Sequence, residues 1–277
     1  MIIDKRHLDD IARRMELIRS SRPQADLAAA KRGDVFVEQD AHHDYSINCL
    51  QRESLDHSAQ IEISYLDQYD STMPERTRRS LRRRSALSKR TLRDAWHWGH
   101  THYKTLEEHF IQTLAAKIDP ELFPGEIAPY RTDNVRILGG IYIPPRAEEV
   151  PNEIYRLIIG MGSQREMHPV ETAAYLHFHV VRIHPFSDTN GRTSRMLQNL
   201  HLAMHGYPPA IIHRAEKTFY NQLLEESIGA YKERTAQDYR SDLRISLEER
   251  RFFDYIASKV TTSLDTVLET INQKRRH

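Results

Sequence analysis

The sequence predicts a mostly helical protein, a helical bundle with one small β-hairpin. Glycine is scarce, with 10 in 277 residues, which is below the average share of about 7%. Arginine, glutamate, leucine and alanine are common, and these residues favour helices. Apolar residues also recur at helical spacing along most of the chain. Together these observations argue against a sheet-rich architecture.

The apolar spacing assigns the helices in order. Pro169 stands near the start of one of them, where its missing N–H costs nothing, and Gly206 ends the next. The expected helices cover residues 1–22, 58–67, 92–117, 148–161, 169–182, 192–205, 214–231 and 246–272.

A β-hairpin is expected at residues 135–143, VRILGGIYI. Two β-rich pieces flank the pair Gly139-Gly140, a combination typical of a tight hairpin turn. Pro144-Pro145 ends the second strand, because proline cannot donate a hydrogen bond to a neighbouring strand.

The charges are nearly balanced, with 40 Lys plus Arg against 39 Asp plus Glu and a net charge of +1. This balance argues against a protein drawn to DNA by its overall charge, so nucleic acid is not an expected partner. Residues 76–93 are nevertheless strongly basic. Such a run is either a solvated helix or linker, or a docking surface for nucleic acid or an acidic protein. No aromatic residue interrupts it, so a base-stacking platform is not expected.

Cys49 is the single cysteine, which excludes intrachain disulfides and cysteine-rich zinc sites. No apolar run approaches the roughly 20 residues that cross a bilayer, and the charged start does not look like a secretory leader. A cytoplasmic protein without a membrane partner is therefore expected.

The segment HPFSDTNGRTSR, residues 184–195, carries the chemistry. It predicts a loop that ends at a helix N-terminus, where free N–H groups and the helix dipole attract an anion. Arg192 and Arg195 are three residues apart, so both lie on one face of that helix. Two guanidinium groups at a helix N-terminus suit a polyphosphate.

Three further residues of this segment complete a reaction site. Asp188 offers a hard oxygen ligand for Mg²⁺, and Asn190 can donate an amide hydrogen to a phosphate. His184 can act as a base near pH 7. This set of groups indicates nucleotidyl or phosphoryl transfer, which depends mainly on positioning and charge stabilisation.

The same segment resembles the signature of the Fic (filamentation induced by cyclic AMP) family, His-Pro-Phe-x-Asp/Glu-Gly-Asn-Gly/Lys-Arg-x-x-Arg. Only Thr189 departs from it, where the family has glycine. A positive φ at this position would strain a β-branched residue, whereas a negative φ would only narrow the space for phosphate. With either sign of φ, the substitution would affect the reaction rate and the nucleotide preference.

The resemblance implies a helical Fic domain over residues 95–245, preceded by an N-terminal helical region, 1–94, and followed by a C-terminal helix, 246–277. It implies a protein adenylyltransferase that transfers AMP from ATP, with Mg²⁺, to a hydroxyl of a target protein, which can be the enzyme itself; a homodimer is compatible with it. His184 would be catalytic and Asp188 would hold the metal. The implied ATP-binding residues are Thr189, Asn190, Gly191, Arg192, Arg195, Tyr220 and Asn221. The hairpin would be a flap that docks the target by strand pairing through Val135, Arg136, Ile137 and Leu138.

A second resemblance lies upstream. Residues 58–63, SAQIEI, are similar to the family's inhibitory motif, Ser/Thr-x-x-x-Glu-Gly/Asn, with Ile63 in the last position. The resemblance implies that Ser58 and Glu62 belong to an inhibitory helix and that Glu62 pairs with Arg195. The alternative for Glu62 is an ordinary exposed helix residue, and for Tyr220 it is helix packing.

Two other functions remain open. The same fold can use another nucleotide or phosphate-containing donor, or remove AMP from a protein. The alternative from a different functional class is a non-catalytic module that binds a partner through residues 76–93.

Overall fold

The computed structural model describes residues 2–21, 38–63, 75–136, 142–163, 167–237 and 245–274. These segments form helices and loops and contain no strand. The centre of the predicted hairpin, residues 137–141, lies outside them. Within the described segments, no helix is both long and apolar enough to cross a bilayer. The main helices are α1 (Lys5–Ser21), α3 (Glu38–Ile63), α4 (Glu75–His102), α5 (Glu108–Ile118), α6 (Val150–Ser163), α7 (Pro169–Ile183), α8 (Asn190–Met204), α9 (Lys217–Gln237) and α10 (Leu247–Lys274).

Helix α7 is the centre of the fold. Its first residue is Pro169, and His168 caps it by accepting a hydrogen bond from the Val170 N–H at 3.2 Å. One face, including Phe178, packs into a hydrophobic cluster shared with α1, α9 and α10. The opposite face, including Leu176 and Val180, packs into a second cluster shared with α4, α5 and α6. Helix α7 therefore lies between the two hydrophobic clusters and contributes residues to each of them.

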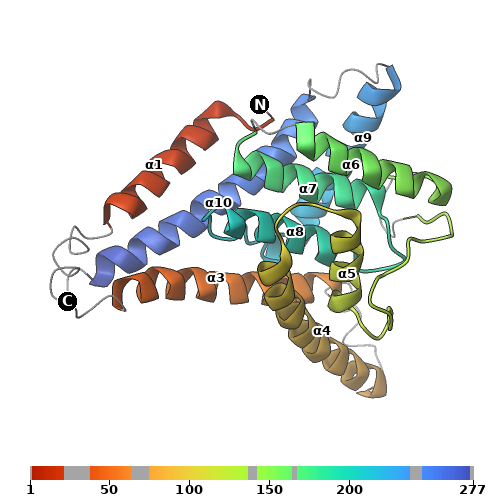
Figure 1. Cartoon of the computed structure of the whole chain (residues 1–277), viewed down its shortest axis with the longest axis horizontal. Coiled ribbons are helices and arrows are strands. Elements are labelled where there is room, and N and C mark those ends of the chain that lie inside the picture. Colours follow the sequence, from red (N-terminus) through yellow and green to blue (C-terminus); the bar gives the residue numbers. More distant parts are fainter. Residues whose placement is uncertain are drawn as a thin grey trace.

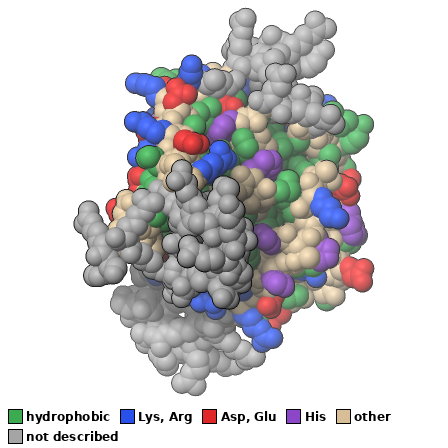
Figure 2. Space-filling view, turned by 60° about the vertical axis from the view of Figure 1, so that its left-hand side comes forward, with side chains coloured by type: hydrophobic (Ala, Val, Ile, Leu, Met, Phe, Trp, Pro, Cys, Tyr) green, Lys and Arg blue, Asp and Glu red, His purple; other side chains and the backbone are tan. Residues whose placement is uncertain are grey.

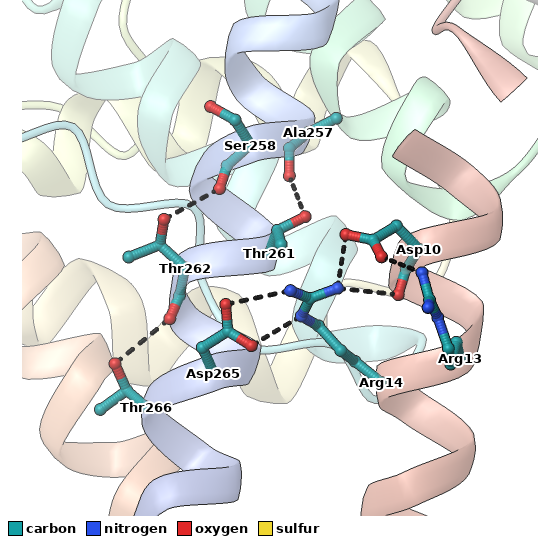
Figure 3. Close-up of polar contacts among 9 residues, drawn as sticks. All are labelled: Asp10, Arg13, Arg14, Ala257, Ser258, Thr261, Thr262, Asp265 and Thr266. Atoms are coloured by element: carbon teal, nitrogen blue, oxygen red, sulfur yellow. Dashed lines mark hydrogen bonds and ion pairs between the residues drawn. The ribbon is translucent and has the colours of Figure 1, made fainter. Parts of the chain in front are cut away.

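Helix α10 runs diagonally between α1 and α3 (Figure 1). A buried apolar stripe on α1, which includes Ile11 and Ile18, faces it. At the edge of this contact the Arg14 guanidinium donates two hydrogen bonds to Asp265 of α10, at 2.6 and 3.2 Å, and also pairs with Asp10 (Figure 3). A two-bond arginine–carboxylate pair fixes orientation as well as contact, so it sets the register of α1 on α10.

Two helix predictions were wrong in their boundaries. The short helix expected at residues 58–67 is the end of a much longer helix, α3, which begins at Glu38 and is described to Ile63. The single helix expected over 92–117 is two helices, because the chain leaves the helix after His102 and starts α5 at Glu108. Tyr103 in this break is buried, and its hydroxyl is hydrogen-bonded to His201 at 3.1 Å.

The remaining expected helices are confirmed within a few residues at their ends, except that α9 continues to Gln237, six residues past the predicted end. Gly99 lets α4 approach α8, since a Cβ there would lie 2.7 Å from Cδ1 of Leu200. Basic, acidic and histidine side chains are interspersed on the face shown in Figure 2. No single sign of charge dominates the described part of this face.

Candidate active site

The loop of residues 184–189 connects α7 to α8, as predicted, and both of its ends have a left-handed backbone. The φ angle is 52° at His184 and 72° at Thr189, and these are the two non-glycine residues with positive φ in the described segments. Histidine tolerates this region better than most residues, whereas a β-branched side chain does so at a cost. Thr189 therefore stands, strained, at a position that suits glycine.

The loop is closed by Asn190, the first residue of α8. Its Oδ1 accepts a hydrogen bond from the Phe186 N–H, and its Nδ2 donates to the Phe186 carbonyl, both at 2.9 Å. Phe186 itself is fully buried, with its ring near those of Phe123 and Tyr130. In this structure the Asn190 amide thus shapes the loop, where the sequence had suggested a phosphate contact.

The N-terminus of α8 is open to an anion. The N–H groups of its first turn, which includes Gly191, have no acceptor within the helix, and the side chain of Thr189 makes no capping hydrogen bond. The carboxylate of Asp188 accepts only the N–H of Thr189 at this end, through Oδ1. An uncapped helix N-terminus combines free donors with the positive end of the helix dipole.

Arg192 lies in this first turn and is 7% exposed. Its Nη2 lies 3.2 Å from an oxygen of Asp119 and 3.6 Å from Oδ1 of Asp188. Its Nε is buried and makes no hydrogen bond within the described segments. Arg192 therefore retains a donor for a bound anion. Asp119 had no signal in the sequence, since it follows α5, far from the motif in the chain.

Arg195 is held by α3. Its Nε donates to Oγ of Ser58 at 2.9 Å, and its Nη2 donates to the Ser58 carbonyl at 3.3 Å. One turn away on each helix, Nδ2 of Asn199 donates to Oγ of Ser54 at 2.8 Å. All four residues are buried. The two pairs run in opposite directions along the chain, so α3 lies antiparallel along α8 and reaches the second arginine of the motif.

The structure describes the predicted inhibitory and flap residues only in part. Glu62 is in α3, four residues after Ser58, and its side chain lies outside the described part. Val135 is half-buried and Arg136 is exposed, whereas Ile137 and Leu138 lie outside the described residues.

Tyr220 and Asn221 are neighbours in α9 that differ in burial. Tyr220 is 2% exposed, and its hydroxyl donates to Nε2 of His177 at 2.7 Å. Nδ1 of His177 donates in turn to Gln198 at 2.6 Å. Burial lowers the pKa of His177 to about 3, so this imidazole is a neutral packing group. Tyr220 thus takes part in the core, and Asn221 is exposed.

Arg131 is a site residue that sequence reasoning missed. It is 6% exposed, and its guanidinium donates to the carbonyls of His184 at 2.8 Å, Asp133 at 2.9 Å and Pro145 at 2.5 Å. Its backbone N–H donates to Pro185 at 2.9 Å. Arg131 therefore fastens both ends of the segment before α6 to the residue expected to act as the base. These partners lie in other segments of the chain or in irregular structure, so no local pattern indicates them.

Asp188 fits the predicted metal ligand. Its side chain is 55% exposed, and the hydrogen bond from Thr189 and the ion pair with Arg192 both involve Oδ1. One carboxylate oxygen facing solvent beside an anion site suits Mg²⁺, which binds proteins through few carboxylates and keeps phosphate and water ligands.

Comparisons with known proteins identify a family domain in this part of the chain. Residues 100–202 match the Fic/DOC family profile, and they lie inside the predicted domain. The chain is 38% identical to the protein adenylyltransferase Fic of Drosophila persimilis over 117 residues, which is 42% of this chain and 23% of that protein. The match therefore spans less than a quarter of that relative's length.

Two solved structures share the fold over nearly the whole chain. A Fic domain-containing signalling protein from Bacteroides thetaiotaomicron aligns with a TM-score of 0.67 and 21% identity, covering 95% of this chain and 98% of that one. Fic-1 from C. elegans aligns with a TM-score of 0.66 and 17% identity, covering 97% of this chain and 73% of that one. At these identities the comparison shows the fold.

Proposed function

We propose that this chain, which carries a Fic/DOC family domain, is a protein adenylyltransferase that transfers AMP from ATP to a hydroxyl of a target protein. The observation that carries the proposal is the open N-terminus of α8, with the buried Arg192 and Arg195 in its first two turns. Free N–H donors and two guanidinium groups at one helix end form a polyphosphate site. The match to adenylyltransferase relatives supports ATP as the donor.

Each residue has a separate task in this reaction. The N–H groups of the first turn of α8 and the two arginines bind the phosphates. Asp188 would hold Mg²⁺, which would neutralise phosphate charge. The target hydroxyl attacks the α-phosphorus, and the bond to the departing pyrophosphate breaks. His184 accepts the hydroxyl proton. Arg131 keeps His184 in place, because it binds the carbonyl of that residue.

The enzyme is restrained by α3. Ser58 occupies two donors of Arg195, and Glu62 follows at a spacing that puts it on the same face of α3. Arg195 can form a two-bond pair with one carboxylate or with the γ-phosphate, not with both. With α3 docked, ATP would bind with its α-phosphate displaced, and an error of about 1 Å costs on the order of 10²-fold in rate.

The proposed activity is tested by incubating the protein with Mg²⁺ and labelled ATP, UTP, GTP or CDP-choline. Incorporation of label from ATP into protein that is lost in His184→Ala supports the assignment. The loss should be about 10²–10⁴-fold, while nucleotide binding is nearly unchanged. Equal labelling by the wild type and His184→Ala would contradict it.

The restraint is tested with three variants of α3. Glu62→Gly and Ser58→Ala should raise AMP incorporation, because each frees Arg195 for the γ-phosphate. Ser54→Ala is the matched control, since it removes a buried hydroxyl from the same interface but from Asn199 rather than Arg195. Equal labelling by the wild type and Glu62→Gly would rule out the inhibitory role, and activation by Ser54→Ala would show that general loosening of α3 is responsible.

A second candidate keeps the fold and changes the donor, or removes AMP instead of adding it. The left-handed backbone of Thr189 favours it, because a strained β-branched residue stands where the family signature has glycine, in the loop that leads into the proposed phosphate site. Preferred labelling from a nucleotide other than ATP, or release of AMP from a modified protein, would identify this case.

A further inference from the structure

A second group of polar side chains lies at the contact between α3 and the loop before the short helix η3 (Arg214–Glu216). Glu53 and His57 are one turn apart on α3, and His213 immediately precedes η3. Nε2 of His57 lies 3.1 Å from Nδ1 of His213 and 3.7 Å from Oε1 of Glu53. Nδ1 of His213 lies 4.0 Å from that same oxygen. Three ligand-type atoms from two separate segments therefore converge.

The three atoms are spaced as three ligands of one metal ion would be. The centre of the circle through the three atoms lies about 2.1 Å from each of them. The usual distance from Zn²⁺ to a histidine nitrogen or carboxylate oxygen is about 2.0–2.2 Å. We propose that Glu53, His57 and His213 bind a divalent transition metal of the zinc class, with a fourth position open to water. Two imidazoles and one carboxylate are a ligand set that suits this class of ion rather than Mg²⁺.

The metal-free cluster is prepared for such an ion. The Arg214 N–H donates to Nδ1 of His57 at 3.3 Å, so the ring proton is on Nε2 and points to His213. On metal binding this proton moves to Nδ1, and the long contact to Arg214 is given up to water. The side chains of Glu53 and His213 are 46% and 39% exposed, which leaves the ion a path from solvent.

The position of the cluster gives the ion a consequence for the enzyme. His57 is adjacent in the chain to Ser58, which binds Arg195. An ion shared by α3 and the residue before η3 would hold α3 on the core with Ser58 in place. Zinc binding would therefore stabilise the state in which the second arginine of the motif is occupied. This part of the inference rests on the proposed restraint, whereas the metal site itself does not.

Binding is tested on the full chain with Zn²⁺ alone by calorimetric titration, without nucleotide. The wild type should bind one more tight equivalent than His213→Ala and Glu53→Gln. Loss of a partner that only orients a ligand costs 10–100-fold in metal affinity, so loss of a ligand should cost at least about 100-fold. His97→Ala, which removes an exposed histidine of α4, is the matched control and should bind as the wild type does. Unchanged stoichiometry and affinity in both ligand variants would overturn the site.

Two further measurements place the ion. Co²⁺ should give the visible absorption of a four-coordinate site in the wild type and not in His213→Ala. Zinc at about 100 times its dissociation constant should raise the Tm by about 5–10 °C in the wild type and slow amide exchange in α3, with neither effect in Glu53→Gln. Slowed exchange confined to other helices would contradict a bridge through α3. Zinc binding that leaves AMP incorporation unchanged would reject the link to Ser58 and retain the metal site.

Discussion

Replacing Arg131 by methionine tests how the loop carrying His184 is supported. Methionine retains much of the apolar stem and removes the guanidinium, so the change isolates the hydrogen bonds to carbonyl oxygens. Three of these bonds are 2.9 Å or shorter. The Asp133 carbonyl belongs to an exposed residue and can turn to water. His184 and Pro145 are both half-buried, so their carbonyls turn to water less readily than that of Asp133.

The expected cost follows from those two bonds. A hydrogen bond to a charged group contributes about 1.5–3 kcal/mol to stability, so Arg131→Met should lower the free energy of unfolding by about 3–6 kcal/mol. At about 2–4 °C per kcal/mol for chains of this size, a loss of about 3 kcal/mol lowers the Tm by about 6–12 °C. Since the His184 carbonyl loses its donor, AMP transfer should fall even at temperatures where the variant remains folded.

The assay is thermal or urea unfolding of Arg131→Met beside Arg136→Met, which removes an exposed arginine of the same segment and should change stability by less than about 0.5 kcal/mol. Arg131→Lys should fall between the two, because an ammonium can reach one carbonyl but not three. If Arg131→Met lost less than about 1 kcal/mol, these carbonyls would have other donors and the supporting role would be refuted.

Three further outcomes are expected. Asp188→Ala should remove most activity together with its dependence on Mg²⁺; a variant with an unchanged Mg²⁺ midpoint would place the metal elsewhere. Thr189→Gly should relieve a left-handed backbone strain of about 1–3 kcal/mol, offset by about 0.5–1 kcal/mol of chain entropy and about 0.8 kcal/mol for the buried methyl group. Urea unfolding should therefore show little net change, while labelled-nucleotide assays show a changed rate or donor preference; a loss above about 3 kcal/mol would contradict the strain. For His177, the unfolded chain takes up a proton near pH 6.5 and the folded chain only near 3, so stability should fall with decreasing pH between these values, by up to about 1.4 kcal/mol per unit. Urea melts of His177→Gln should show a shallower pH slope than the wild type, and parallel slopes would refute this assignment.

The sequence predicted the helices around the motif well because their signals are local. Pro169 marks the start of α7, and apolar spacing fixes its faces. The left-handed φ at Thr189 was one of two alternatives that the departure from glycine raised, and the backbone decides between them.

The predicted helix boundaries were wrong where tertiary contacts determine where a helix begins or ends. Helix α3 extends through a stretch with little apolar periodicity, and contacts such as Ser54 with Asn199 hold it on α8. The break after His102 contains neither glycine nor proline, and no turn signal announces it. A buried Tyr103 bonded to His201 on another helix accompanies it, which only the folded chain reveals.

The supporting residues of the site were unpredictable for a related reason. Arg131 and Asp119 act on residues more than fifty positions away. Each is an ordinary charged residue in a segment with many others. A motif indicates which side chains contact the substrate. The side chains that position them can be identified only from contacts that form in the folded chain.

The place of α7 between the two hydrophobic clusters has a consequence for cooperativity. Neither cluster can melt alone without exposing one face of this helix, so the chain should unfold in a single transition. A contact far from the site, such as the Arg14–Asp265 pair between α1 and α10, therefore contributes to the stability of α7, the helix that ends at His184. Loss of that contact should destabilise α7 as well. Temperature-sensitive loss of activity can therefore arise from the outer helices, with every residue of the motif intact.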